Sequence, residues 1–340
     1  MRPRVTIAVA LTVAAVAMSP AARADEVTLR IGTMAPAGTA WARELNAFAR
    51  EIGVATKGQV HIKFYFGGIS GDEPAMGERI RRGQLDGAAS GGPLCEALSP
   101  SMRVMRVVGL LTTQREASWV ASQLWPTFES EMHKNGVVGL GTATLGPHIV
   151  FSRRPVRSID DLKKTRFWVW DRDDVLRAEL SSLGVDGLAL PVADAARAYD
   201  EHRIDGFISP ASVALAFQWS AMTRFVTDLR IDYITACVVV AERAFDPLPP
   251  ETRNLIRSAG GKLAVRFADL GAREDAMLID GLFQKQGVTT VPVDPRFAGE
   301  FFELARATRD KLDARLVPKA LLSHVLAILA DFRATQTATR

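Results

Sequence analysis

Residues Ser158–Trp170 read SIDDLKKTRFWVW, and this stretch decides how the rest of the chain is interpreted. A short helical turn with an acidic start and a basic break are followed by a predicted β-strand with alternating bulky side chains. The alternation places Phe167 and Val169 on one face and Trp168 and Trp170 on the other. Both indoles can be ordinary core, because strands of α/β domains are usually covered on both faces. They can equally line a cleft, and the stretch alone leaves both interpretations open.

The first 24 residues have the three parts of a secretory signal peptide. Arg2 and Arg4 form a basic head, Val5–Met18 is an apolar run, and Ala22–Ala24 supply a small-x-small cleavage site before Asp25. The apolar run is too short to span a bilayer, and no later run is long enough. We therefore expect a periplasmic protein that does not itself span a membrane.

Composition is that of an ordinary folded protein, with 48% hydrophobic and 24% charged residues in a chain of 340, which is long enough for two domains. Removal of residues 1–24 takes away three arginines and no acidic residue, so the formal charge falls from +4 to +1. Nothing in this near-neutral balance indicates a nucleic-acid partner.

The two cysteines, Cys95 and Cys237, lie far apart in the sequence. An exported protein can form disulfides. Cys237, however, lies in the apolar run Thr235–Val240, where a small buried thiol is the simpler interpretation. The sequence therefore favours free thiols over a disulfide.

Predicted elements alternate between strands and helices. The mature chain begins with a strand over residues 27–31, a helix over 40–56 and a strand over 60–66, which is the order of a parallel sheet with crossover helices. A helix, a basic residue, an apolar residue and Asp-Gly precede a strand at Arg82–Gly87 and again at Arg203–Gly206. Here the glycine is expected to end the helix with positive φ. The repeat indicates two similarly built α/β domains.

A long helix is predicted near the end of the chain, after the proline cluster Phe245–Pro250. It covers residues 251 to about 286. We expect it to break or bend near Gly260-Gly261 and Gly271, because glycine weakens a helix interior. Further helices complete the C-terminus.

Five segments, taken in order, resemble the DctP-type solute receptors of TRAP transporters. They are Gly71–Met76, Arg82–Gly87, Arg153–Lys163, Arg203–Gly206 and Phe245–Pro250. The resemblance covers about residues 27–292. It implies a two-lobed α/β fold with hinge strands and a long late helix spanning the lobes. Lobe I would comprise residues 25–145 and about 236–278, and lobe II residues 146–235 and about 279–340. Such a receptor closes on one small ligand and delivers it to the membrane subunits of a sodium-driven permease.

The chain departs from the family pattern at the ligand clamp. In the family, a strand arginine after Asp-Leu-Lys binds the ligand carboxylate through its planar guanidinium. That position is Trp168 here, with Arg166 two residues earlier on the same strand face. A second cationic position is His148, and the polar residue expected before Pro210 is Ser209.

An aromatic or cation-stacking lining replaces the clamp. The candidate ligand-binding residues are Trp168, His148, Ser209, Phe207, Trp170, Met34 and Arg166. Aromatic rings give contact area and accept cations, while one or two polar groups fix orientation. We expect a ligand that is neutral and largely hydrophobic or aromatic, or else cationic. The alternative is a carboxylate ligand bound by a shifted arginine, Arg166 or Arg172.

An enzyme is the less favoured class. Ala88–Gly92 resembles a nucleophile elbow around Ser90, but alanine replaces its first glycine and a helix precedes the strand. The five histidines lack metal-ligand spacing, and Gly139-Leu-Gly141 lacks the third glycine of a dinucleotide loop. We expect no catalytic residue, no metal and no cofactor. A ligand-sensing receptor that serves no permease is the remaining alternative.

Overall fold

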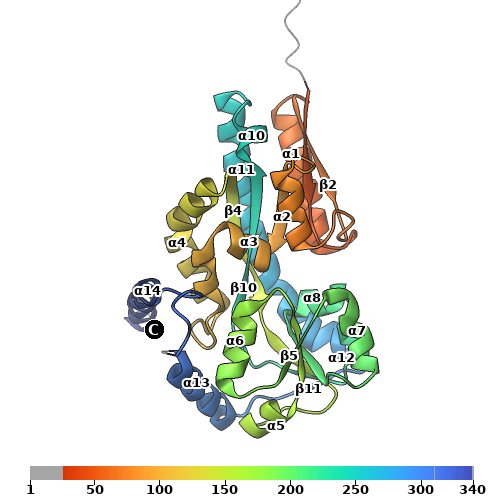
Figure 1. Ribbon diagram of the computed structural model, residues 1–340, viewed down its shortest axis with the longest axis vertical. Helices are drawn as coiled ribbons and strands as arrows, with labels where there is room; N and C mark the ends of the chain where they lie inside the picture. Colours follow the sequence, from red (N-terminus) through yellow and green to blue (C-terminus); the bar gives the residue numbers. More distant parts are fainter. Residues whose placement is uncertain (1–25, 310, 339–340) are drawn as a thin grey trace, which may run out of the picture.

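The computed structural model describes residues 26–309 and 311–338, and Figure 1 shows two lobes stacked along the long axis. The expected signal peptide, its cleavage site and Asp25 lie outside these residues. Within the described residues, none of the helices has both the length and the hydropathy that crossing a bilayer requires.

The first lobe is built around a five-stranded sheet. Its strands, in spatial order, are β2 (Val60–Tyr65), β1 (Val27–Gly32), β3 (Gly87–Gly91), β10 (Tyr233–Ala241) and β4 (Val137–Pro147). β1 pairs in parallel with β2 and β3, as the β-α-β order predicts, whereas β10 is antiparallel to both of its neighbours.

The second lobe is built around a six-stranded sheet. Its strands, in spatial order, are β11 (Thr289–Val291), β9 (Phe225–Thr227), β5 (Ile149–Ser152), β8 (Gly206–Ser209), β6 (Phe167–Trp170) and β7 (Gly187–Leu190). β6 is parallel to β7 and β8, and β5 is antiparallel to β8. The prediction of two α/β lobes is confirmed.

Helices bury both faces of the first sheet. α1 (Ala40–Ala55) presents Leu45, Phe48 and Ile52 to one face, the spacing that predicts this helix, and Thr39 caps its N-terminus. The long helix α11 (Pro250–Met277) covers the same face. The remaining helices are α2 (Glu73–Arg81), α3 (Pro93–Leu98), the 3-10 helix η1 (Pro100–Arg106), α4 (Gln114–Lys134) and α10 (Glu242–Phe245).

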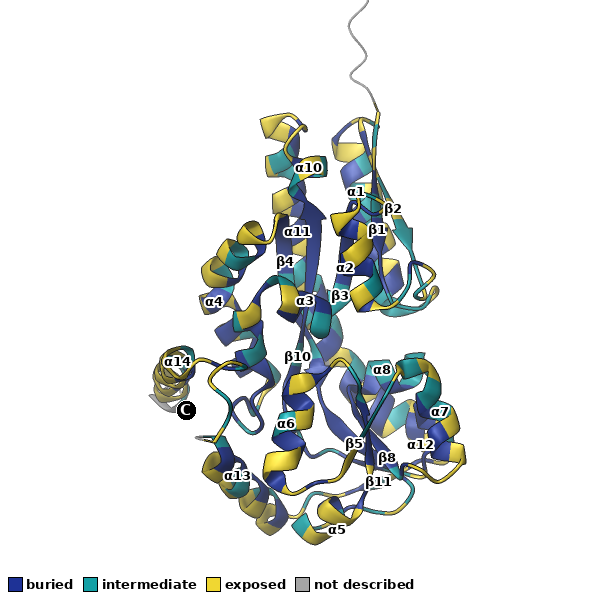
Figure 2. Ribbon diagram, in the orientation of Figure 1, coloured by how far each residue is buried: buried dark blue, intermediate teal, exposed yellow. Residues whose placement is uncertain are grey.

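Helices likewise bury both faces of the second sheet, and Figure 2 shows its central strands β5 and β8 as buried between partly exposed helices. On one face lie α5 (Ile159–Lys164), α6 (Asp174–Leu183) and α13 (Pro295–Arg309). On the other lie α7 (Val192–Asp200), α8 (Ala211–Ala216), α9 (Trp219–Met222), the π-helical turn η2 (Leu278–Leu282) and α12 (Phe283–Lys285).

The alternation along β6 is confirmed. Phe167 and Val169 join the core under α6 and α13, while Trp168 and Trp170 pack on the opposite side with Trp219. The alternation of side chains along the strand, every second residue on the same face, therefore identified the two faces of β6 correctly.

The explanation given for the two Asp-Gly sequences is wrong. The positive φ values that end the two helices occur at Gly83 and His202, whereas Gly87 and Gly206 are strand residues. A Cβ on Gly87 would lie 2.1 Å from the Val239 carbonyl oxygen, and one on Gly206 would lie 2.3 Å from that of Phe151. These glycines are required because neighbouring strands approach too closely for a side chain.

The expected break in the long helix is also wrong. α11 is continuous through all three glycines and then passes through η2 into α12, so the irregularity lies at Leu278–Leu282. A Cβ on Gly260 would lie 2.4 Å from the Leu140 carbonyl oxygen, and one on Gly271 would lie 3.0 Å from that of Thr144. These two glycines let the helix backbone lie directly on β4.

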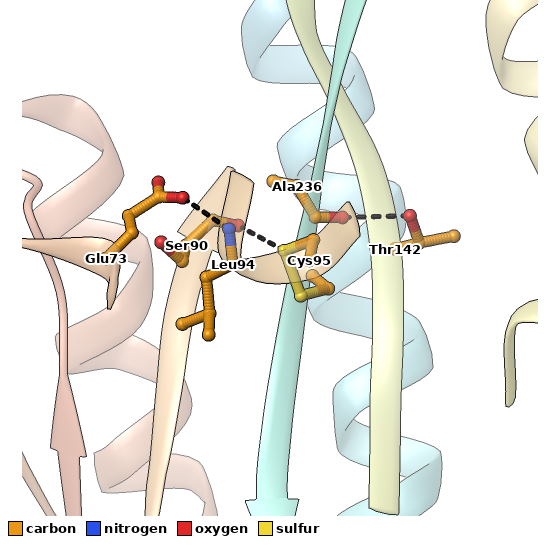
Figure 3. The surroundings of a disulfide bond; sticks show 7 residues. Glu73, Ser90, Leu94, Cys95, Thr142 and Ala236 are labelled. Carbon is orange, nitrogen blue, oxygen red and sulfur yellow. Dashed lines mark hydrogen bonds between the residues drawn. A yellow bond between two sulfur atoms is a disulfide. The ribbon is translucent and has the colours of Figure 1, made fainter. Parts of the chain in front are cut away.

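Cys95 and Cys237 form a disulfide, which corrects the expectation of free thiols. The bond joins α3 to the central strand β10, and both cysteines are buried (Figure 3). The chain turns back after β3, so that α3 lies over the strand that pairs with β3. Cα atoms 142 residues apart therefore come within 5.8 Å, a proximity that sequence spacing does not indicate.

The C-terminal helices divide between the lobes. α13 packs on α5 and α6 of the second lobe, but α14 (Lys319–Ala338) packs on α4 and η1 of the first. The predicted boundary placed all of residues 279–340 in lobe II, so α14 departs from it. Trp119 of α4 is 42% exposed and stacks on Phe332 of α14.

Candidate ligand-binding site between the lobes

A cavity of about 200 Å³ lies between the lobes and is lined by residues from both sheets and from α11. Its walls come from the carboxyl ends of β1, β3 and β8, together with β6, α8 and α9, and such strand ends are where α/β folds bind ligands. Four of the six tryptophans in the sequence line it. The aromatic lining residues are Trp41, Trp168, Trp170, Trp219, Phe217 and Phe267.

Trp168 lines the cavity and is also tightly packed. Its indole N–H donates to the Leu190 carbonyl oxygen at 3.0 Å, and its ring centroid lies 4.9 Å from that of Trp219. The side chain is 7% exposed. Trp170 also lines the cavity and is less buried. The two interpretations of these indoles, core and cleft, therefore both describe Trp168.

Phe207 does not line the cavity, although it was predicted to. Its ring is fully buried between Tyr199 and Trp219, at centroid distances of 5.3 Å and 4.6 Å. Phe207 and Trp168 are register partners on adjacent strands, but Trp219 covers Phe207 from the cavity side. Trp219 is the lining residue that the sequence interpretation missed.

Neither candidate shifted arginine reaches the cavity. Arg166 lies at the solvent surface, where its Nε is 2.6 Å from Asp186 Oδ2. Arg172 is exposed beside Asp171. Neither belongs to the lining.

Arg106 is a lining residue that the sequence interpretation also missed. Its guanidinium, 1% exposed, contacts three carboxylates: Glu96 at 3.1 Å, Asp173 at 2.8 Å and Asp232 at 3.2 Å. These carboxylates raise the pKa of Arg106 despite its burial, so it stays charged. Asp173 is the N-cap of α6, so this buried pair also joins the two lobes.

His148 lines the cavity but has its own carboxylate partner. Its Nδ1 lies 2.8 Å from Asp232 Oδ1, and both side chains are buried. Burial favours protonation of Asp232, but His148 and Arg106 outweigh it and lower the pKa of that carboxyl. His148 is therefore held against Asp232 at the edge of the cavity.

Polar groups of lobe I complete the lining. Met34 and Ser90 line the wall, and Glu73, at the start of α2, accepts a hydrogen bond from the Leu94 N–H at 2.7 Å (Figure 3). Burial raises the pKa of the Glu73 carboxyl to about 7, although the hydrogen bond from the Leu94 N–H favours its charged form. On the opposite wall, Ser209 donates its hydroxyl to the Pro210 carbonyl oxygen at 3.1 Å.

Residues 31–314 match the family described as bacterial extracellular solute-binding protein, family 7, which is the DctP family. The chain belongs to this family. It is therefore a bacterial extracellular solute-binding protein, a receptor for a small molecule rather than an enzyme.

Relatives of this family 7 receptor share its fold at low sequence identity. The 2,3-diketo-L-gulonate-binding periplasmic protein YiaO of Escherichia coli is 23% identical over 69% of this chain and 72% of its own length. A TRAP periplasmic solute-binding protein from Desulfovibrio salexigens, solved with orotic acid, has a TM-score of 0.82 at 17% identity, covering 90% of this chain and 99% of its own. Another, from Haemophilus influenzae with L-gulonate, has a TM-score of 0.80 at 16% identity, covering 89% and 100%.

The arrangement of this family 7 receptor suits binding rather than bond breaking. The lining is mostly apolar, and its Arg106, Asp173 and His148 side chains are held in ion pairs with buried partners, whereas Glu73 is held by a backbone N–H. Within the described residues, no group of three or more His, Cys, Asp or Glu side chains is arranged to hold a metal ion.

Proposed function

We propose that this receptor captures a small ligand without a carboxylate clamp and delivers it to the membrane subunits of a TRAP-type permease. The ligand is neutral and largely apolar or aromatic, or else cationic. The protein is exported through the signal peptide of residues 1–24 and begins at Asp25 after cleavage.

The observation that supports this ligand class is the occupation of the clamp position by Trp168 in a cavity without an available guanidinium. Across residues 26–309 and 311–338, Arg106 is the single arginine or lysine that lines the cavity, and three carboxylates already share it. Turning Arg106 to a ligand carboxylate would leave those buried carboxylates unpaired, which is strongly unfavourable.

Two of the named relatives were solved with ligands of a different chemical class. L-gulonate and orotic acid, bound by two of the solved structures, are both carboxylic acids. The resemblance implies that family members bind such carboxylates with an arginine at the position that Trp168 occupies here. The aromatic residue at that position favours a different chemical class for this receptor.

A thermal-shift screen of the mature protein tests the ligand class. Aliphatic and aromatic alcohols, amines and carboxylates are compared at one concentration, because a ligand that binds only the folded state raises its stability. We expect stabilisation by alcohols or amines and none by carboxylates. Tight binding of a carboxylate by the wild type would contradict the proposed ligand class. The Trp168→Arg variant is the matched comparison, because carboxylates should bind to it more tightly than to the wild type.

A further inference from the structure

We propose that the ligand is a small organic amine bound as its cation, with the Glu73 carboxylate as counter-ion and the surrounding indoles against its apolar part. This inference rests on the proposed receptor function and narrows its ligand class to amines.

Glu73 is a buried carboxyl group without a basic partner. The groups that act on it are the Leu94 N–H, the Ser90 hydroxyl, the Gly91 N–H and a second carboxyl, Glu96. No arginine, lysine or histidine of residues 26–309 and 311–338 forms an ion pair with it. Burying a charge is costly unless it is paired, so this carboxyl lacks the cation that would favour its ionised form.

The charges around the cavity also favour a cationic ligand, because acidic groups outnumber basic ones there. Glu96, Asp173 and Asp232 contact one guanidinium, Arg106, and Asp232 also contacts the imidazole of His148, while Glu73 adds a fourth carboxyl that forms none of these ion pairs. Burial and the neighbouring carboxyls raise the pKa of Glu96 to about 7, although Arg106 lowers it. A monocation entering the cavity reduces the mutual repulsion of these carboxyls, whereas a carboxylate ligand adds to it.

The rest of the lining suits the carbon skeleton of such an amine. Trp41, Trp168, Trp170 and Trp219 contribute indole rings to a single cavity. Indole faces attract ammonium groups by about 0.5–2 kcal/mol and pack on apolar groups equally well. A carboxylate retains acceptor sites after one backbone N–H is bound, so Glu73 can bind an ammonium while still holding Leu94.

A purely structural role for Glu73 has to be distinguished from a role in binding the ammonium group. The Leu94 N–H belongs to the first turn of α3, so Glu73 also caps that helix. The Glu73→Gln variant distinguishes the roles, because its amide oxygen can still accept from Leu94 but carries no charge. Glu78→Gln is the matched control, since Glu78 lies on the exposed face of the same helix, α2.

The experiment is calorimetric titration of the mature wild type and both variants with two matched sets of compounds. One set is 2-phenylethylamine, 2-phenylethanol and 3-phenylpropanoate, and the other is cyclohexylamine, cyclohexanol and cyclohexanecarboxylate. We expect at least one amine to bind more tightly than its alcohol and its carboxylate. Glu73→Gln should lower the affinity for that amine by about tenfold or more, as expected for loss of a charge-assisted hydrogen bond. Glu78→Gln should leave that affinity unchanged.

Three results would overturn the inference: a carboxylate that binds more tightly than its amine, an amine whose affinity is the same in Glu73→Gln and wild type, or no binding of either amine. Melting curves of Glu73→Gln show whether the variant is folded. If an alcohol binds instead, only the amine assignment falls. If a carboxylate binds instead, the proposed ligand class falls with it, and only the receptor function stands. If nothing in these sets or in the wider screen binds, the proposed function falls as well.

Discussion

Trp168 stands where the family resemblance implies a clamp arginine, and its ring both lines the cavity and is buried in the core of the second lobe. Truncation to Ala removes a ligand contact, so affinity for the ligand found by screening should fall about ten- to a hundredfold. It also removes a buried ring and the hydrogen bond to Leu190, so the free energy of unfolding should fall by about 3–5 kcal/mol. Titration and melting of Trp168→Ala and Trp168→Phe measure the two effects. Unchanged affinity in both folded variants would remove Trp168 from the site.

Glu73 should make the stability of the unliganded protein depend on pH. Burial raises its folded pKa to about 7, above the ordinary 4.5. The folded state therefore holds a proton that the unfolded state has already released. This contribution to stability is complete below about pH 4.5 and is lost as pH rises through 7, with a slope of at most about 1.4 kcal/mol per pH unit. Denaturant midpoints between pH 6 and 8 should fall less steeply in Glu73→Gln than in wild type, and parallel curves would contradict this.

Arg106 and Trp219 are among the lining residues that the sequence interpretation missed, and neither could be recognised from spacing. Arg106 lies in an apolar stretch, and its partners Glu96, Asp173 and Asp232 come from three separate segments. Nothing in the sequence shows that Trp219 covers Phe207. Alternation along a strand tells which face a side chain is on and not what lies above it, so the face of Trp168 was predictable and the burial of Phe207 beneath Trp219 was not.

Glycine substitutions in α11 test its close packing on β4. Gly260→Ala puts a Cβ 2.4 Å from the Leu140 carbonyl oxygen and should destabilise the protein by about 1–3 kcal/mol. Gly261→Ala is the matched control, because a Cβ there meets nothing within 4 Å and the helix should gain about 0.5–1 kcal/mol. Denaturant unfolding of both variants measures the difference, and equal effects would show that close packing does not govern this helix.

The disulfide between α3 and β10 should contribute strongly to stability. It closes a loop of 142 residues, and replacing both cysteines by Ala should lower the free energy of unfolding by about 2–5 kcal/mol. Dithiothreitol should lower the melting temperature of the wild type but not that of the double variant. A wild type unaffected by complete reduction would show that the bond adds nothing to the packing of α3.

Element boundaries within each lobe were largely predictable, because they depend on local signals. Thr39 caps α1 directly before the predicted helix start at residue 40, and β1 and β2 end within a residue of the predicted strands 27–31 and 60–66. The path of α11 was not predictable in detail, since its glycines respond to β4, more than 100 positions earlier. The same limit applies to the disulfide, whose partners are brought together only by the pairing of β3 with β10.

At the scale of the whole molecule, the position of the cavity predicts a change of shape. Lining residues come from both lobes, so a ligand that contacts both favours the closed arrangement. Small-angle scattering should give a smaller radius of gyration at saturating ligand than without ligand. Identical profiles would argue against closure of the lobes around the ligand.

The place of β10 in the first sheet has a consequence for how the receptor is made. β10 is the central strand between β3 and β4, yet it follows every strand of the second sheet except β11 in the sequence. During synthesis, β3 and β4 therefore emerge long before the strand that joins them, and both leave open edges that invite pairing with other chains. A stop codon after Asp232 would yield an aggregation-prone fragment rather than half a receptor. The nascent chain depends on protection until its last third has been made.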